Sequence, residues 1–437
     1  MAEAPVDAET ELRSWERLLP YRSLMGVLRV PVPLPDCPPR PRGGVVTRSW
    51  PLRWKRRRTR TSSNGAYAAL KASVTVLALL AFGVVGVGCS DSSTAISVIS
   101  TLDSSTTVDE RGLLAGLESN EDARLDQFNG AVLVARNDQV LFAKAYGLAD
   151  REEEIPNTVQ TRHRIGSMNK MFTAVAILQL VEAGKVELDA TVGDYLTDYP
   201  NEEVASNVTV HQLLTHTGGT GDIFGPEFDA HRLELRIHDD YLELYGTREP
   251  EFEPGSQHVY SNYGYVLLGA VIEHVTGQNY DEYVQEQIYE PAGMVATGSL
   301  PEEVDVPNRS VGYMGTPTNL VPNSDTLPYR GTAAGGGYST VEDLARFGHA
   351  ILNHELLSPD GTDLLLNAKV DSGYAYGFVD LRETEGFVGH GGGAPGMNGD
   401  LRLFPESSYV IAVLANMDPP AAFPISTYLT ARIEADD

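Results

Sequence analysis

The sequence predicts an α/β fold of the α+β kind, in which one antiparallel sheet lies beside a helical lobe. Two observations carry this prediction. Segments with strand patterning stand at both ends of the body of the chain, and the long middle, residues 186–350, is typical of short helices and loops punctuated by Gly and Pro. Because strands from the two ends can pair in one sheet while the middle packs as a helical layer, this architecture is favoured.

The expected elements follow in chain order. A helix is predicted over residues 109–128, where Leu and Phe recur at helical spacing. Strands at 130–135 and 139–143 are joined by a tight turn. A helix runs from Ser167 to about residue 183, and an apolar helix covers 263–276. Three further strands and a final helix complete the body, at residues 386–390, 400–404, 409–414 and 420–432.

The composition of the 437-residue chain is that of a folded protein and excludes several classes of function. With 42% hydrophobic and 21% charged residues, the chain is neither wholly disordered nor collagen-like. Two cysteines exclude a disulfide framework and a Cys-based zinc or iron–sulfur site. No metal or other cofactor is expected. The net charge of −27 argues against nucleic acid as a partner.

The charge is distributed unevenly along the chain. The first 88 residues hold 14 Lys and Arg and 6 Asp and Glu, a net charge of +8, which leaves −35 for the rest. A basic cluster at 55–58 and an apolar run at 74–88, short against the about 20 residues of a spanning helix, are typical of a secretory signal. We expect residues 1–88 to form a basic extension with a signal or anchor, 89–109 a Ser/Thr-rich tether, and 110–437 the globular domain.

Cys89 follows small residues directly at the end of the apolar run. This resembles a bacterial lipoprotein cleavage site, although Gly86 stands where a larger aliphatic residue is usual. Ordinary cleavage and an uncleaved anchor are the alternatives. In each case we expect export, with the protein on the outer face of the cell membrane or secreted, and membrane attachment through the N-terminal segment or a lipidated Cys89.

The first candidate for chemistry is Ser167, which opens a predicted helix with Lys170 three positions later. Residues at i and i+3 lie on one helix face, so the lysine can reach the serine hydroxyl. A free serine is a poor nucleophile and needs such a base, and the unpaired N–H groups of a helix start favour developing negative charge. The alternative is that Ser167 only caps the helix.

A second candidate element is Tyr260-Ser-Asn262, at the start of the apolar helix. A tyrosine beside a lysine can lose its proton more easily, and can then serve as base toward serine and acid toward the leaving group. The asparagine amide can hold a substrate carbonyl. The alternative for Tyr260 is aromatic packing. A second Tyr-x-Asn triplet at 199–201 is set aside, because it lies in a proline turn with no helix expected after it.

The third candidate element is His390 with the glycines Gly391, Gly392 and Gly393, at the end of a predicted strand. Glycines let a substrate lie against a strand edge, and an exposed N–H there can complete an oxyanion hole. His216-Thr-Gly has the same form, but it follows a helical segment and is expected to be a helix C-terminal turn.

Ser-x-x-Lys, Tyr-x-Asn and His-x-Gly, in this order, resemble the three motifs of the β-lactamase and penicillin-binding serine hydrolases. The Tyr form of the second motif is similar to the class C β-lactamases and their D-peptidase and esterase relatives. The flanking segments at 213–219, 291–294, 334–345 and 389–396 agree. The resemblance covers about residues 110–437 and implies an antiparallel sheet flanked by helices beside an all-helical lobe.

The resemblance also implies roles for these residues. Ser167 is the nucleophile, Lys170 and Tyr260 share the proton transfers, and Asn262, His390 and Gly392 contact the substrate. The N–H groups of Ser167 and Gly393 form the oxyanion hole. Which of Lys170 and Tyr260 is the general base stays open.

One departure from the class C pattern concerns His390, because class C β-lactamases have Lys there. A free histidine, with a pKa near 6.5, is mostly neutral at pH 7 and suits the carboxylate of a β-lactam less well. We therefore expect a monomeric serine hydrolase acting on an ester, an amide or a D-amino-acid peptide, such as an esterase or a D-Ala-D-Ala carboxypeptidase. A class C-like β-lactamase is the alternative, and a non-catalytic cell-wall peptide-binding protein is the alternative of another class.

Overall fold

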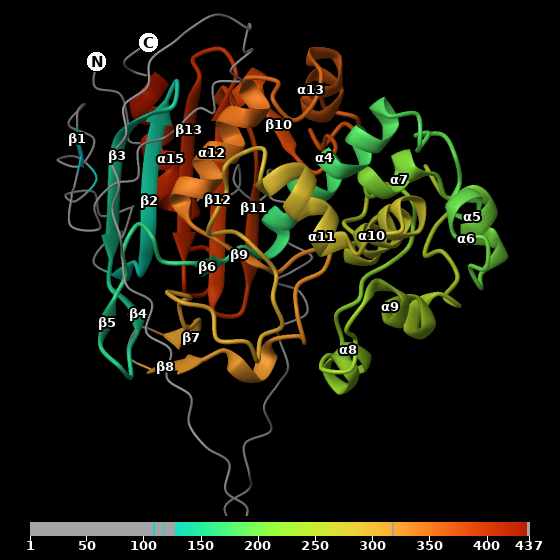
Figure 1. Cartoon of the computed structure of the whole chain (residues 1–437), viewed down its shortest axis with the longest axis horizontal. Coiled ribbons are helices and arrows are strands. Elements are labelled where there is room, and N and C mark those ends of the chain that lie inside the picture. The colour runs from blue at the N-terminus through green and yellow to red at the C-terminus, as the bar shows by residue number, and fades with distance from the viewer. Residues whose placement is uncertain (1–107, 110–116, 118–126, 317–318, 435–437) are drawn as a thin grey trace, which may run out of the picture. The chain divides into compact units, whose positions relative to one another are not determined.

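The computed structural model describes residues 108–109, 117, 127–316 and 319–434 (Figure 1). All of these belong to one compact unit, residues 96–437. The predicted extension, signal and most of the tether, Cys89 included, lie outside the described residues. So does most of the helix predicted over 109–128. Its first residue, Asp109, lies in strand β1 (Val108–Asp109) instead.

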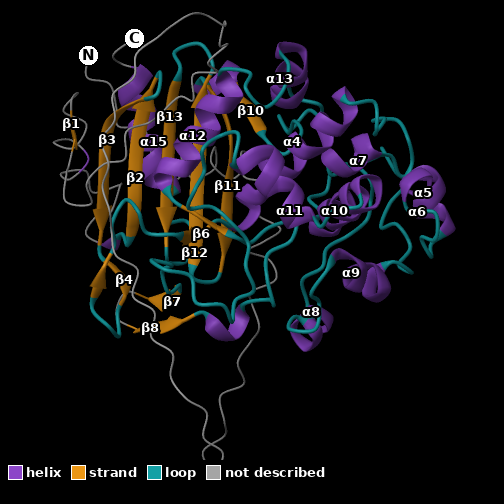
Figure 2. Cartoon of the chain, viewed as in Figure 1, coloured by secondary structure: helices purple, strands orange, loops and turns teal. Residues whose placement is uncertain are grey.

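One seven-stranded antiparallel sheet joins the two ends of the described chain, in the order β1-β3-β2-β13-β12-β11-β10 (Figures 1 and 2). The hairpin of β2 (Gly130–Arg136) and β3 (Gln139–Tyr146) pairs through β2 with β13 (Tyr409–Ala415). The sheet continues through β12 (Met397–Phe404) and β11 (Phe387–Ala394) to β10 (Val379–Leu381). The predicted antiparallel sheet built from both ends of the chain is confirmed.

Both faces of this sheet are buried. On β2, Val132 and Val134 belong to the core that includes α15 (Phe423–Glu434), whereas Leu133 between them belongs to the core that includes α12 (Val341–Leu352). Successive side chains of a strand point to opposite faces. A strand that is covered on both faces therefore has an unbroken apolar run, which is what β2 and β13 show.

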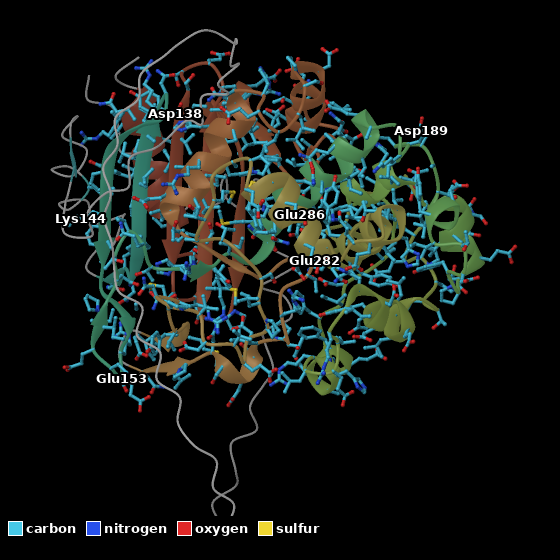
Figure 3. The ribbon with its side chains drawn as sticks, in the orientation of Figure 1. Asp138, Lys144, Glu153, Asp189, Glu282 and Glu286 are labelled. Atoms are coloured by element: carbon cyan, nitrogen blue, oxygen red, sulfur yellow. The ribbon has the colours of Figure 1, made fainter. Side chains whose placement is uncertain are left out.

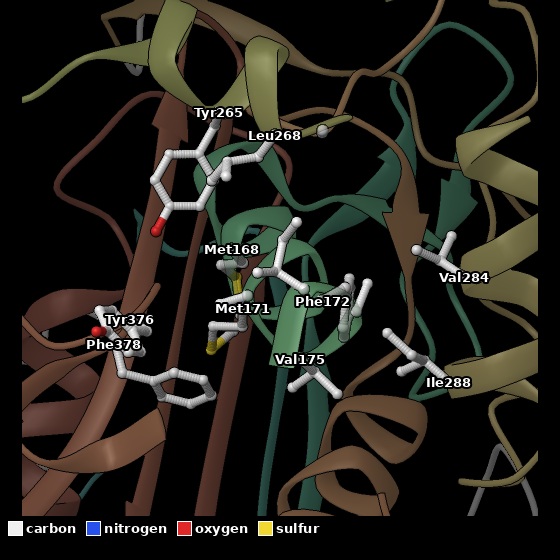
Figure 4. Packing of buried hydrophobic residues seen from close by; sticks show 14 of the residues in the cluster. Met168, Met171, Phe172, Val175, Tyr265, Leu268, Val284, Ile288, Tyr376 and Phe378 are labelled. Carbon is white, nitrogen blue, oxygen red and sulfur yellow. The ribbon is translucent and has the colours of Figure 1, made fainter. Parts of the chain in front are cut away.

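Helix α4 (Asn169–Glu182) is the central helix between the sheet and the helical lobe. Residues 169–178 are all buried, so this helix is enclosed on every side. In Figure 4, Phe172 and Val175 of α4 lie between Phe378 on one side and Ile288 on the other, all in the same core. The first two turns of α4 are therefore packed on both sides.

The remaining elements form the helical lobe, small two-stranded ribbons and short turns (Figure 2). The helices of the lobe are α5 (Val192–Tyr195), α6 (Glu202–Asn207), α7 (Val210–Leu214), α8 (Pro226–His231), α9 (His238–Tyr245), α10 (Asn262–Thr276) and α11 (Tyr280–Val284), which runs into the π-helical turn η3 (Gln285–Tyr289). The ribbons are β4 (Leu148–Asp150) with β5 (Ile155–Pro156), β6 (His163–Arg164) with β9 (Tyr338–Ser339), and β7 (Tyr313–Thr316) with β8 (Asn319–Pro322). The short helices η4 (Ser324–Thr326), α13 (Pro359–Leu366) and α14 (Arg382–Glu385) complete the described chain.

Several sequence predictions differ from the structure in their bounds. The helices over 263–276 and 420–432 are found as α10 and α15, and the turn between β2 and β3 lies at Asn137 and Asp138, both with positive φ. Strand β11 is longer than the predicted 386–390 and includes the glycines of the third motif, because β12 pairs with it as far as Ala394.

The surface of the described unit carries many acidic side chains. Glu153, Asp189, Glu282 and Glu286 are exposed and are labelled in Figure 3. Within the described ranges, the helices are all too short or too polar to cross a membrane.

Candidate active site

Ser167 lies where the sheet meets the helical lobe. The chain leaves β6, turns at Gly166 with a φ of 53°, and enters the 3₁₀ turn η2 (Gly166–Met168), which continues directly into α4. Ser167 is half-buried. The prediction that Ser167 opens the helix is confirmed, with the 3₁₀ turn as its first part. The N–H groups of this first turn favour a negative charge beside them.

The Lys170 side chain is fully buried one helical turn after the serine. Its Nζ donates a hydrogen bond to Asn262 Oδ1 at 2.7 Å and lies 4.7 Å from the centroid of the Tyr260 ring. Burial lowers the pKa of Lys170 to about 7, while the Asp222 carboxylate acts in the opposite direction. The lysine can therefore gain and lose a proton near neutral pH, as a proton acceptor in catalysis must.

Tyr260 and Asn262 are positioned by the cap of α10. Ser261 is the N-cap residue, and its Oγ accepts the N–H of Gly264 at 2.9 Å. The cap places Asn262 as the first helical residue, with its side chain buried against Lys170, and leaves Tyr260 half-buried just before the helix. The start of α10 thus brings Tyr260 and Asn262, which are far from Lys170 in the sequence, close to the Lys170 side chain.

The glycines of β11 lie against the turn that carries the serine. A Cβ on Gly392 would lie 2.0 Å from the carbonyl oxygen of Ile165, so only glycine allows the strand this close. The backbone nitrogen of Gly393 lies 3.2 Å from the point that a Cβ on Gly166 would occupy. The strand edge and the start of α4 are therefore in direct contact, and an N–H of β11 stands beside the serine turn.

His390 is buried on the same strand. Its Nδ1 lies 2.5 Å from the carbonyl oxygen of Gly391, which can only accept, so Nδ1 carries the proton. Its Nε2 therefore accepts a hydrogen bond from the Tyr374 hydroxyl at 3.2 Å. Burial, and then the charge of Lys170, lower the pKa of His390 to about 4. The expectation of a pKa near 6.5 is corrected here: the histidine is neutral well below pH 6.5.

His216 lies beside the candidate site, which the sequence did not indicate. It follows α7 with a φ of 57°, which confirms the predicted helix C-terminal turn. Its buried ring also lies 4.3 Å from the Tyr260 ring and 4.6 Å from the Tyr374 ring, and its Nδ1 accepts the Ser261 N–H at 3.1 Å. Burial and the charge of Lys170 hold the pKa of His216 well below its usual value. The neutral His216 ring therefore packs against the Tyr260 ring.

Asp222 was also missed. It lies in the loop between α7 and α8 and accepts the Asn262 Nδ2 on both carboxylate oxygens, at 3.0 and 3.2 Å. Nothing in the spacing of the sequence singles it out, because one aspartate in a glycine-containing loop is an ordinary loop residue.

The triplet at 199–201 also differs from its prediction. A helix, α6, does follow it, and Asn201 caps that helix by accepting the Val204 N–H at 2.9 Å. Tyr199 hydrogen-bonds to the Tyr263 hydroxyl at 3.1 Å inside the lobe. The triplet is structural, although the stated reason for setting it aside was wrong.

The structure thus gathers the residues of all three motifs at one place: Ser167, Lys170, Tyr260, Asn262, His390, Gly392 and Gly393. Their chemical roles stay predictions. In the part of the chain that the structure describes, three or more His, Cys, Asp or Glu side chains do not gather as they would around a metal ion.

The fold is that of a known class of proteins. The family model described as Beta-lactamase matches residues 117–435, and the chain belongs to the β-lactamase family, whose members with this fold are serine hydrolases. Penicillin-binding protein 4* of Bacillus subtilis (strain 168) is 28% identical over 318 residues, which cover 67% of this chain and 69% of that protein.

Two solved structures are also similar. The penicillin-binding protein from Bacillus halodurans has a TM-score of 0.65 and 32% identity, covering 72% of this chain and 99% of that one. The D-stereospecific amidohydrolase from Streptomyces sp. has a TM-score of 0.60 and 27% identity, covering 73% of this chain and 97% of that one.

Proposed function

We propose that the protein hydrolyses esters, amides or D-amino-acid peptides through an acyl-enzyme on Ser167. The single observation that carries this proposal is the buried Lys170, one helical turn from Ser167, whose pKa of about 7 leaves much of it neutral at physiological pH. A neutral amine beside a serine hydroxyl is a competent base, and a buried charged lysine without that use would be costly.

In the proposed first half-reaction, the Ser167 hydroxyl gives its proton to the neutral Lys170 as its Oγ attacks the substrate carbonyl. The N–H groups of Ser167 and Gly393 stabilise the negative charge on the carbonyl oxygen. The proton then passes to the leaving alcohol or amine, with Tyr260 beside Lys170 as the acid. Water repeats these steps on the acyl-enzyme and releases the free acid and Ser167.

The substrate class is inferred from charge and from the relatives. A neutral His390 offers no fixed cation for a substrate carboxylate, which favours neutral esters and amides over β-lactams. A relative named as a D-stereospecific amidohydrolase adds support for D-amino-acid amides. Relatives named as penicillin-binding proteins support the second candidate, a protein that is acylated by β-lactams and releases them slowly or hydrolyses them.

The test is covalent labelling followed by a substrate panel. Intact mass spectrometry after treatment with a fluorophosphonate should show one adduct on the Ser167 peptide. The adduct should be absent in Ser167→Ala and unchanged in Ser324→Ala, which removes an exposed serine elsewhere. Persistence of the adduct in Ser167→Ala would refute the proposal.

The panel consists of a p-nitrophenyl ester, D-amino-acid amides, a D-Ala-D-Ala peptide and a chromogenic cephalosporin. Ser167-dependent turnover of the ester or the D-substrates supports the proposed class. Turnover of the cephalosporin alone favours the β-lactamase alternative. Labelling with no turnover of any substrate favours the binding-protein alternative.

A further inference from the structure

Asp222 is the second partner of the Asn262 side chain, on the side opposite Lys170. Asn262 Oδ1 accepts from Lys170 Nζ at 2.7 Å, and its Nδ2 donates to Asp222 Oδ1 at 3.0 Å and Oδ2 at 3.2 Å. The asparagine amide thus stands between an acid and a base. The three side chains come from three elements: the loop after α7, the start of α10 and the first turn of α4.

The charges of the two neighbours determine which way the amide faces. If the amide were rotated by half a turn, its NH₂ would face the Lys170 amine and its oxygen would face the Asp222 carboxylate. Carboxylate oxygens are hydrogen-bond acceptors, so two acceptor oxygens would face each other and that contact would be repulsive. Asp222 therefore allows only the orientation in which the amide oxygen holds Lys170.

The loop fixes Asp222 before any substrate arrives. Its Oδ1 accepts the N–H of Ile223 at 2.6 Å, and its backbone carbonyl accepts from Arg248 Nη1 at 2.9 Å. Arg248 is in turn paired with Glu227 at 2.5 Å. The preceding residue, Gly221, has a φ of 71°, a conformation that favours glycine, and its carbonyl accepts from the Ser261 hydroxyl that caps α10. The carboxylate and the start of α10 are thus tied together.

We propose that Asp222 is a positioning residue, which fixes the Asn262 amide and through it holds the Lys170 amine against Ser167. This inference rests on the proposed function and assigns a role in it to a residue outside the three motifs.

The charge of Asp222 has a second consequence, for pH dependence. Lys170 is faced by Asp222, by the rings of Tyr260 and Tyr265, and by His216 and His390. The charge of Lys170 lowers the pKa of both histidines. Of the groups that act on Lys170, the Asp222 carboxylate raises its pKa and burial lowers it. Removing the charge of Asp222 should therefore lower the pKa of Lys170 further and extend the activity to lower pH.

The experiment compares Asp222→Ala, Asp222→Asn and the control Asp198→Asn, which removes an exposed aspartate from the same lobe. Ester hydrolysis and the rate of fluorophosphonate labelling are measured from pH 5 to 9. Asp222→Ala should lower kcat by about tenfold to a hundredfold, the cost of a misplaced catalytic group. Asp222→Asn keeps an acceptor for the Asn262 NH₂ and should recover part of this loss, but not all of it, because its own NH₂ can also pair with the rotated amide. In both variants the acid limb of kcat/KM should move to lower pH by roughly one pH unit, because an opposite charge has been removed.

Four outcomes separate the possibilities. The predicted kcat loss, its partial recovery in Asp222→Asn and the shifted acid limb support the proposal. An unchanged kcat in Asp222→Ala, or an acid limb that does not move in either variant, overturns it. A rise of KM confined to substrates with a free amino group would show that Asp222 binds substrate, and also overturns it. If Ser167→Ala hydrolyses the ester and is labelled at the rates of the wild type, the proposed function itself has failed, whatever the Asp222 variants do.

Discussion

Lys170 is the residue on which the proposed chemistry depends most directly. Burial disfavours its charged form and the Asp222 carboxylate favours it, and the balance places its pKa at about 7. The neutral form is the base, so its population rises with pH through this value. The kcat/KM of the wild type should therefore rise between about pH 6 and 8 and level off above.

Lys170→Met and Tyr260→Phe should each lower kcat by more than about a hundredfold, because each removes a proton-transfer group. Since the two act as one unit, the double variant should be little worse than either single variant. Steady-state ester hydrolysis at pH 8 measures this, with Lys185→Met, an exposed lysine just after α4, as the control. Additive losses would show that the two residues do not share the proton.

His390 leads to a prediction about substrate charge. With its pKa lowered to about 4, it stays neutral from pH 5.5 to 8. The ratio of kcat/KM for a carboxylate-bearing ester to that for its neutral analogue should be flat over this range, because the Lys170 titration cancels in the ratio. His390→Lys should raise this ratio by a few-fold to tens-fold. One close ion pair is worth about 1–4 kcal/mol, from a water-like to a surface-like dielectric. The expected gain is smaller than the upper end of this range because the lysine must also be desolvated and ordered.

This prediction is checked by measuring both esters with wild type and His390→Lys at each pH. A wild-type ratio that climbs below pH 6.5 would mean that His390 does become charged in the site. An unchanged ratio in the variant would mean that His390 does not sense substrate charge, and the argument against β-lactamase activity would lose its main support.

At the scale of elements, the site depends on the close approach of β11 to the turn that carries Ser167. Gly392→Ala would place a methyl group 2.0 Å from the Ile165 carbonyl oxygen and force the strand and the turn apart. Gly389→Ala is a matched control on the same strand, because its methyl group would meet the Leu401 carbonyl of β12 at the same distance, away from the turn.

Both glycine variants should lose stability, by roughly 1–3 kcal/mol each for overpacking, measured by denaturant unfolding. Only Gly392→Ala should also lower kcat/KM, by about a hundredfold. A displacement of the Ser167 turn by about 1 Å is enough to cause a rate loss of this size. Equal losses of activity in the two variants would mean that stability, and not the geometry of the serine turn, limits catalysis.

For the whole molecule, the charge asymmetry and the N-terminal pattern lead to the proposal that the protein is exported. The motive is the basic cluster, the apolar run and Cys89 in an extension of net charge +8 ahead of a body of −35. Fractionated cells should contain the hydrolase outside the cytoplasmic membrane. Cells grown with a radioactive fatty acid should label the wild type and Cys37→Ser, but not Cys89→Ser. Equal label in all three, or none, would refute lipidation and leave export untouched.

The order of elements and the site motifs could be predicted from the sequence because both depend on short-range patterns. Alternating and unbroken apolar runs mark β2, β12 and β13, and longer, mostly apolar runs mark α4 and α10. Ser167 and Lys170 lie in one turn of one helix, and Tyr260 and Asn262 at one helix start. These four residues could therefore be predicted as site residues without knowledge of the rest of the fold.

What the tertiary structure alone decided is the environment of these residues. The contact of Asp222 with Asn262 spans 40 positions and that of Lys170 with Asn262 spans 92, so no local pattern reports them. The neutral state of His390 follows from the burial of its side chain on β11 and from the nearby charge of Lys170. Burial and the distance between charges are properties of the packed chain, and a pKa responds to both. The sequence by itself determined which groups are present, and only the packing decided which of them carry a proton at neutral pH.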